Sequence, residues 1–211
     1  MDIIFFGQSS FKLKGKTTTV ITDPYEGSVG GKFPKSEADV ITLSLKDTRK
    51  TVADQIGGEP LILSGPGEYE VKEVKIVGIE SFADNKQGKE RGKNIIYSIN
   101  VDGLQICHLG NLGQDQLSTE QMEIIGAVDI LLIPTGGVDT IDASVAAKIS
   151  AELEPKIVIP MHFDGGNDKL EPVEKFIKEM GAEKTESQPK ISIKKDRLPQ
   201  ELSVVLLEKL K

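Results

Sequence analysis

The two histidines of this chain are the residues whose type and position most directly suggest chemistry. His108 follows an apolar run at 104–107, and His162 follows another at 157–161. Such runs are typical of buried strands, and ligand sites gather where buried strands end. The alternative for each histidine is a buried imidazole that is hydrogen-bonded to the backbone. We expect the two to lie at the same edge of a sheet sandwich, separated by no more than the ~10 Å spacing of packed sheets.

Several common chemistries can be tested against the residues that they require. Zinc takes three or four ligands from His, Cys, Asp and Glu, and two histidines with scattered carboxylates are a weak set. Cys107 and His108 are neighbours on a strand, so their side chains should point to opposite faces. The glycine-lysine pair at 15–16 lacks the earlier glycine of a phosphate loop, and residues 65–70 lack the third glycine of a dinucleotide loop. No Gly-x-Ser-x-Gly elbow occurs.

Composition and charge exclude several classes of protein. The 211 residues are 38% hydrophobic and 28% charged, which is typical of soluble globular proteins. A net charge of −7 argues against general nucleic-acid binding, and the apolar runs are far shorter than the ~18 residues of a membrane span. The first residues lack the basic segment of a secretory leader, and a single cysteine permits no internal disulfide. We therefore expect a cytoplasmic protein that binds neither nucleic acid nor membranes.

The first half of the chain should position these residues on short strands. Apolar runs alternate with tight turns, and Asp102-Gly103 is a strong hairpin signal, so most of these strands are expected to pair antiparallel. The predicted strands are 3–6, 10–13, 17–22, 40–43, 60–63, 74–79, 94–101 and 104–107.

The second half adds helices between apolar strands. Ser118 and Gln121 form a capping box, Asp142 can cap a second helix, and a third helix opens near Pro172 and stops at Gly181. The predicted strands are 128–133, 157–160, 191–193 and 202–207. Helices that interrupt a long series of strands predict an α/β fold, a layered sandwich with the sheets inside, as a single domain over residues 1–211.

Eight connecting segments carry a resemblance to a known family. They are residues 6–11, 22–25, 38–44, 65–69, 91–94, 107–113, 134–142 and 159–163. In this order and spacing they resemble the metallo-β-lactamase superfamily, in a small branch of zinc-dependent hydrolases related to the ascorbate-6-phosphate lactonases. The resemblance covers residues 1–163. It implies a four-layer αββα sandwich with a metal site at the shared edge of the two sheets.

The resemblance also implies where the metal ligands should lie, and most of those positions are changed. A His-x-His-x-Asp-His signature should follow Ser44, a further histidine should follow Phe82, and an aspartate should bridge the two ions. The residues at the changed positions are Leu45, Asp47, Arg49, Lys50, Ala83 and Asn111. His162 matches the last histidine ligand. His108 matches a family histidine that precedes the bridging aspartate and lies next to the ligands without binding the metal itself. Together with Asp23 and Asp84, these residues define what we call the ancestral pocket.

Three functions are compatible with these changes. Zinc hydrolases depend on an ion that lowers the pKa of its bound water to ~7. Leu45 has no lone pair to donate, and Arg49 and Lys50 carry charge that repels a dication. The leading hypothesis is therefore a binding, regulatory or structural member of the family, with no catalytic residues, no metal and no other cofactor. Its ligand would be a small molecule or an anion, and helices on the outer faces would suit a homo-oligomer.

The two alternatives use the same pocket differently. One is a hydrolase of lactones, phosphate esters or sugar phosphates, in which Asp23, Asp47, Asp84 and His162 surround zinc or a harder cation such as Mg²⁺ or Mn²⁺. The other is an anion pocket, in which Arg49, Lys50 and His162 hold a phosphate or a carboxylate. If no metal is bound, as in the leading hypothesis and in the anion pocket, the retained carboxylates need a new counter-charge. We therefore predict that Arg49 or Lys50 turns inward to pair with Asp23, Asp47 or Asp84.

Overall fold

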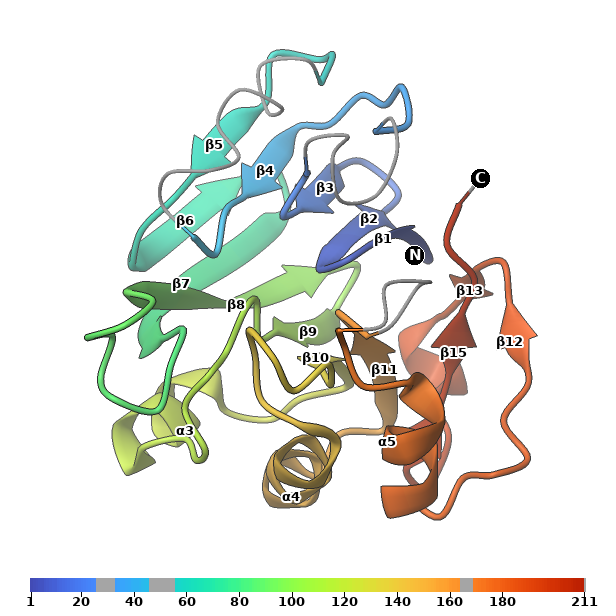
Figure 1. The fold of residues 1–211 in the computed structure, drawn as a ribbon. Helices are drawn as coiled ribbons and strands as arrows, with labels where there is room; N and C mark the ends of the chain where they lie inside the picture. The colour runs from blue at the N-terminus through green and yellow to red at the C-terminus, as the bar shows by residue number, and fades with distance from the viewer. Residues whose placement is uncertain (26–32, 46–55, 164–168, 211) are drawn as a thin grey trace.

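Two β-sheets pack face to face, and helices cover the outer face of the second sheet (Figure 1). The computed structural model describes residues 1–25, 33–45, 56–163 and 169–210. The predicted α/β fold is confirmed, with two multi-strand sheets and, in the described part of the chain, three α-helices. Asp47, Arg49 and Lys50 lie outside the described residues. No helix in the described part of the chain is long and apolar enough to cross a bilayer.

The first sheet combines an antiparallel meander with parallel strands. Its members are β1 (Asp2–Gly7), β2 (Ser10–Lys14), β3 (Thr19–Thr22), β4 (Val40–Thr42), β5 (Leu61–Leu63) and β13 (Ile191–Ser192), in the order β13-β1-β2-β3-β4-β5. Strands β3, β4 and β5 are parallel to one another, so they are exceptions to the antiparallel pairing expected for most of these strands. Parallel neighbours need long crossover connections, and residues 23–39 and 43–60 supply these.

The second sheet is antiparallel on one side and parallel on the other. Its members are β6 (Gly67–Val71), β7 (Val74–Phe82), β8 (Lys93–Val101), β9 (Leu104–His108), β10 (Ile130–Pro134), β11 (Ile157–Met161) and β14 (Ser203–Val204), in the order β14-β11-β10-β9-β8-β7-β6. Strands β9, β10, β11 and β14 are parallel to their neighbours in this run. A separate pair joins β12 (Ser187–Gln188) to β15 (Leu206–Leu207).

The helices in the described part of the chain are three α-helices, which begin where the sequence signals place them, and one short 3-10 turn, which those signals did not predict. They are α3 (Thr119–Ile125), α4 (Ala143–Leu153), α5 (Val173–Glu179) and the single turn η1 (Lys195–Arg197). The capping box of Ser118 and Gln121 is formed, and the Asp142 carboxylate accepts a hydrogen bond of 2.9 Å from the Val145 amide. The buried face of α4 includes Ile149 and Leu153 and packs in an apolar cluster against the second sheet.

The two sheets are held together by an apolar layer and by one deeply buried hydroxyl. Residues such as Ile3, Leu13 and Ile106 fill the space between them. Tyr97 on β8 is fully buried, and its hydroxyl lies 3.0 Å from the carbonyl oxygens of Leu43 and Leu63 on the first-sheet side. Burial raises the pKa of Tyr97 above its ordinary range, so this phenol stays protonated and donates.

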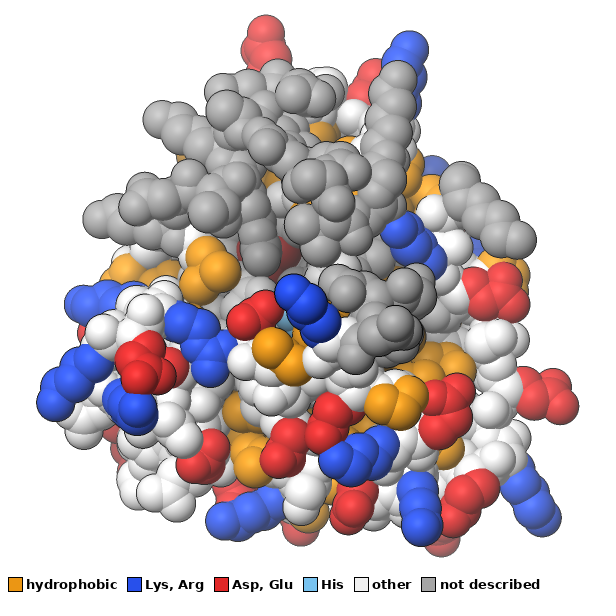
Figure 2. Space-filling model, viewed as in Figure 1, with side chains coloured by type: hydrophobic (Ala, Val, Ile, Leu, Met, Phe, Trp, Pro, Cys, Tyr) orange, Lys and Arg blue, Asp and Glu red, His pale blue; other side chains and the backbone are white. Residues whose placement is uncertain are grey.

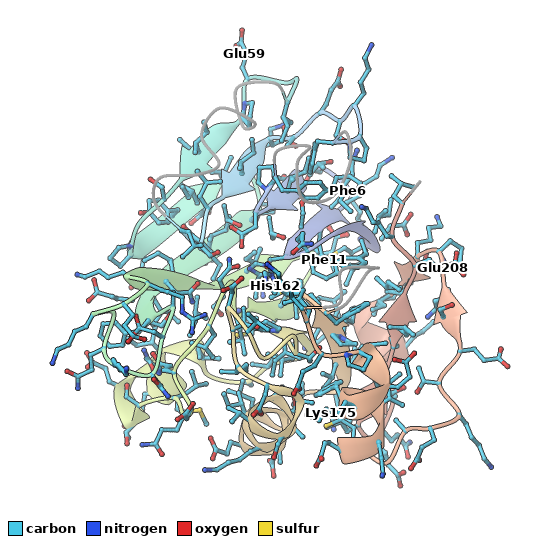
Figure 3. The ribbon with its side chains drawn as sticks, viewed as in Figure 1. Phe6, Phe11, Glu59, His162, Lys175 and Glu208 are labelled. Atoms are coloured by element: carbon cyan, nitrogen blue, oxygen red, sulfur yellow. The ribbon has the colours of Figure 1, made fainter. Side chains whose placement is uncertain are left out.

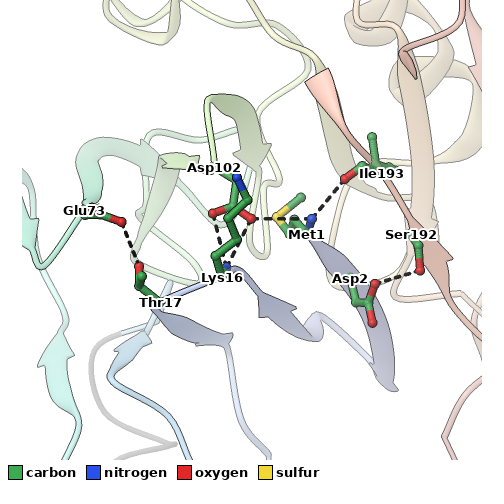
Figure 4. A network of polar contacts seen from close by, with 8 residues as sticks. All are labelled: Met1, Asp2, Lys16, Thr17, Glu73, Asp102, Ser192 and Ile193. Carbon is green, nitrogen blue, oxygen red and sulfur yellow. Dashed lines mark hydrogen bonds and ion pairs between the residues drawn. The ribbon is translucent and has the colours of Figure 1, made fainter. Parts of the chain in front are cut away.

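A polar network closes the sandwich at the edge where β1 begins and the β8–β9 hairpin turns (Figure 4). The amino group of Met1 donates to the carbonyl of Ile193 at 3.0 Å and lies 3.5 Å from the Asp102 carboxylate. That carboxylate also accepts from the backbone amide of Lys16. This network fixes one edge of the sheets, and the opposite edge holds the ancestral pocket.

Candidate functional site

The carboxyl ends of several strands from both sheets meet at one edge of the sandwich (Figure 1). Side chains at such ends point into a shared crevice, which is where α/β proteins bind ligands. The residues that directly follow strands β1, β3, β4, β9, β10 and β11 are Gln8, Asp23, Leu43, Leu109, Thr135 and His162.

The two histidines meet at one serine. His108 is fully buried, and its Nε2 lies 2.8 Å from the backbone oxygen of Ser9. Because a carbonyl oxygen only accepts, this Nε2 carries a proton. The hydroxyl of Ser9 lies 3.4 Å from Nδ1 of His162. The prediction that both histidines lie at the same edge is thus confirmed, and His162 is labelled in Figure 3.

The backbone holds His162 in a conformation that few residues adopt. Its φ is +52°, and its amide donates to the carbonyl of Gln8 at 2.9 Å. The carbonyl of His162 also lies only 2.2 Å from the point where a Cβ on Gly136 would stand. Glycine at 136 therefore allows the loop after β10 to pass directly beside the histidine.

A chain of hydrogen bonds joins three further pocket residues. Asp23 is 1% exposed, and its carboxylate accepts from both the backbone amide and the hydroxyl of Ser44, the amide at 2.7 Å. The hydroxyl of Ser44 in turn accepts from Nδ2 of Asn111 at 2.9 Å. The sequence singled out Asp23 and Asn111, and it missed that Ser44 would connect them.

Asn94 holds the backbone of Asn111, one member of this series of hydrogen bonds. Asn94 was not identified as a site residue from the sequence. Its Oδ1 accepts from the backbone amide of Asn111 at 2.8 Å, while its Nδ2 donates to Ser81 and to the carbonyl of Leu109. The signal available in the sequence was an asparagine at the start of an apolar strand pattern, and the structure buries its side chain completely. Gly110 permits the contact, because a Cβ there would lie 2.4 Å from the Cβ of Ser44.

Asp84 has a different role from the one that the hydrolase alternative gave it. Its carboxylate accepts four backbone amide hydrogen bonds, from Arg91 at 2.6 Å, Lys86 at 2.8 Å, Gly88 at 2.9 Å and Glu90 at 3.0 Å. These bonds, above all the one from Arg91, lower the pKa of Asp84 to about 2. Both of its oxygens are thus used to fold the 85–91 loop.

The remaining described positions of the ancestral pocket offer no metal ligand. Ala83 is buried and Leu45 is half-buried, and neither side chain has a lone pair. In the described part of the chain no group of three or more His, Cys, Asp or Glu side chains could hold a metal ion. The donor set of a zinc hydrolase is therefore not met by these residues.

Arg91 links two loops of the structure. Nη1 of Arg91 donates to the carbonyl of Val138 at 2.9 Å and lies 3.6 Å from the Asp139 carboxylate. This contact joins the 85–91 loop to the loop after β10. Acidic and basic side chains are interspersed over the described part of the visible face (Figure 2).

Comparison with known proteins gives a family model and several solved structures that share the fold. The model of the beta-lactamase superfamily domain matches residues 2–162. A solved structure from Thermotoga maritima, described as a candidate zinc-dependent hydrolase of the metallo-β-lactamase superfamily, is 32% identical with a TM-score of 0.83, over 98% of this chain and 97% of that one. The metallo hydrolase Igni18 from Ignicoccus hospitalis shares the fold at 16% identity and a TM-score of 0.68, over 92% of this chain and 99% of that one.

A sequence relative carries a similar description. A metal-dependent hydrolase of the UPF0173 group from Pyrococcus furiosus is 30% identical over 139 residues. The match covers 65% of this chain and 61% of that relative, so it spans less than two thirds of either protein.

Proposed function

This chain belongs to the metallo-β-lactamase superfamily, and from that premise we propose that it is a cytoplasmic ligand-binding member that no longer performs zinc-dependent hydrolysis. The observation that carries the proposal is the hydrogen bond from Asn111 to Ser44. The resemblance places a bridging aspartate at position 111. An amide there is neutral, and its Nδ2 is already engaged as a donor toward Asp23 through Ser44.

Zinc hydrolysis needs a dication held by several anionic or imidazole ligands, so that the bound water ionises near pH 7. Leu45 and Ala83 replace two ligands with hydrocarbon, and Asn111 replaces a carboxylate with an amide. His162 is the one described ligand position that keeps its family residue type. A single imidazole binds zinc weakly, because structural and catalytic sites use at least three protein ligands.

The ligand that we propose is a small molecule with a phosphate or carboxylate group. His162 is half-buried at the pocket edge and can donate a charge-assisted hydrogen bond to such a group when it is protonated. Arg49 and Lys50 follow Ser44 closely in sequence and would supply further donors. In this proposal the ligand binds where family members bind theirs, but side-chain donors hold it in place of a metal ion.

A second candidate is a hydrolase with a rearranged metal site, as the descriptions of the Thermotoga and Pyrococcus relatives favour. Asp23, Asp47 and His162 are the residues that would then hold a hard cation, with a lactone or phosphate ester as substrate. Asp84 is not among them, because four backbone amides already engage its carboxylate.

Metal analysis separates the two candidates. Protein purified without chelator should contain well under one equivalent of zinc, manganese or magnesium, and adding these ions should not raise its melting temperature, because only an ion that binds the native state can stabilise it. His162→Ala is the matched variant, and its metal content should equal that of the parent. One equivalent of metal that is lost in His162→Ala, together with metal-dependent hydrolysis of an ester or phosphodiester, would establish the second candidate instead.

A further inference from the structure

A concavity lies between the end of β7 and the start of α3, and Asp84 is the one residue of the ancestral pocket in the lining that the structure describes. Its volume is about 560 Å³, which is within the range of small-molecule sites. Half of the described lining residues carry amide side chains, and these are Asn85, Gln87, Gln114, Gln116 and Gln121. We call it the amide pocket.

The floor of the amide pocket is fixed by two glutamines. Gln114 accepts from the backbone amide of Phe82 at 3.2 Å and donates to Oε1 of Gln121 at 2.8 Å. Gln121 donates to the carbonyl of Glu80 at 2.8 Å and accepts from the amide of Ser118 at 2.9 Å. These bonds tie the end of β7 to the start of α3, so the pocket is formed before any ligand arrives.

The rim of the pocket is open to a ligand. Asn85, Gln87, Asp115 and Gln116 are exposed, and within the described part of the chain their side chains make no hydrogen bond. Three of them are amides, each with both donor and acceptor groups, and the fourth is a carboxylate that only accepts. Asn85 is presented by the loop that Asp84 folds, so its backbone position is fixed as well.

The charges and the apolar part of the lining narrow the ligand class. Neither Lys nor Arg belongs to the lining that the structure describes, whereas Asp84 and Asp115 do, so a phosphate or carboxylate would meet like charge. Phe82 and Leu117 add hydrocarbon surface. Amides around a small apolar surface match hydroxyl groups, which also donate and accept, on a ring with C–H faces. We propose that the amide pocket binds a neutral polyhydroxylated molecule of monosaccharide size.

Saturation-transfer NMR on the full chain tests this with glucose, galactose, mannose and arabinose as probes. At least one sugar should bind, with a Kd of about 1 mM or tighter. Asn85→Ala and Gln116→Ala should each weaken binding about five-fold, as expected for the loss of one hydrogen bond. Gln200→Ala, an exposed glutamine outside the pocket, is the matched control and should bind as the parent does.

Three results would overturn the proposal. They are no binding of any of the four sugars, binding that survives in the Asn85→Ala/Gln116→Ala double variant, or tighter binding of glucose 6-phosphate or of methylammonium than of the neutral sugars. The rim side chains are exposed, so melting temperatures close to that of the parent should accompany these variants. The result does not depend on the metal content of the ancestral pocket, so the two proposals can fail separately.

Discussion

Asn111 donates its side-chain amide to the hydroxyl of Ser44 at 2.9 Å, and this bond sets the direction of a buried chain of donors that ends at Asp23. The hydroxyl has one proton, which it gives to the carboxylate, so it must accept from residue 111. An amide satisfies that requirement and a carboxylate does not. Asn111, at the position where the resemblance places the bridging aspartate, therefore supplies the donor that the Ser44 hydroxyl requires.

Asn111→Asp should destabilise the fold by about 3 kcal/mol at pH 7, because it places a second buried carboxylate near Asp23 with one hydroxyl proton between them. The introduced carboxyl should have a raised pKa in the folded state. The parent and the variant should therefore approach equal stability below the unfolded pKa of about 4, and the deficit should grow as pH rises through the folded value. Urea unfolding across pH measures this.

Asn111→Ala is the matched control, since it removes the donor without adding charge and should cost about 1–2 kcal/mol at every pH. An Asn111→Asp protein as stable as the parent would contradict the directional network. So would an Asn111→Asp protein that zinc restores to parental stability, because the carboxylate would then have a metal partner.

Asp84→Asn should remove a pH dependence at the acid end of the stability curve. The folded pKa of Asp84 is about 2, below its ordinary value, so its contribution to stability is present above pH ~4 and is lost as pH falls toward 2. The variant should lose less stability than the parent across that window. Hydrogen exchange at the amides of Gly88 and Arg91 should quicken at neutral pH, because both donate to this carboxylate.

Asp139→Asn is the control for this window, because Asp139 is exposed and lies 3.6 Å from the same arginine. It should leave the acid limb of the curve and the exchange rates unchanged. Equal acid limbs for Asp84→Asn and the parent would show that the 85–91 loop does not depend on the Asp84 carboxylate.

Tyr97→Phe should destabilise the fold by about 1–2 kcal/mol, because the carbonyl of Leu43 loses a donor that reaches it from the facing sheet. Tyr69→Phe is the comparison, since the Tyr69 hydroxyl is partly exposed and its two contacts are 3.3 Å long. It should change the free energy of unfolding by no more than about 0.5 kcal/mol. Equal changes in the free energy of unfolding for the two substitutions would show that the buried inter-sheet hydrogen bond contributes no more to stability than the exposed contacts of Tyr69.

Local sequence signals predicted where the α-helices begin. Some strand boundaries were mispredicted, because strands depend on pairing between distant segments. Ser118 and Asp142 cap the helices that they precede, because capping involves residues three positions apart. Strand β6 was missed because Glu68 and Glu70 give it a charged, exposed pattern at the edge of the sheet. The predicted strand at 202–207 is divided at Val205, where the chain leaves the second sheet to pair with β12.

The same distinction holds for the site. Resemblance located Asp23, Asn111 and His162 by sequence position, and the structure brings their strands to one edge. Ser44 and Asn94 were missed because their importance lies in hydrogen bonds that span 21 and 17 positions, which no local pattern encodes. Asp84 was named as a candidate metal ligand, whereas its carboxylate accepts backbone hydrogen bonds that fold the 85–91 loop.

The last prediction concerns the charge that would balance Asp23 if, as proposed, no metal binds nearby. Asp23 is buried, and Ser44 supplies neutral donors, so a carboxylate in this position gains from a cation. Arg49 and Lys50 lie outside the described residues, and they follow Ser44 within six positions. We expect one of them to pair with Asp23, and the corresponding alanine substitution to cost about 3 kcal/mol, because a buried carboxylate would be stranded.

A double-mutant cycle with Asp23→Asn gives the decisive comparison. If Arg49 or Lys50 pairs with Asp23, its removal should cost much less in the Asp23→Asn background, with a coupling energy of about 1 kcal/mol or more. Urea unfolding of the parent, the single variants and the double variants measures this. If Arg49→Ala and Lys50→Ala each change stability by about 0.5 kcal/mol or less, and neither is coupled to Asp23, both are solvated surface residues and charge substitution is refuted.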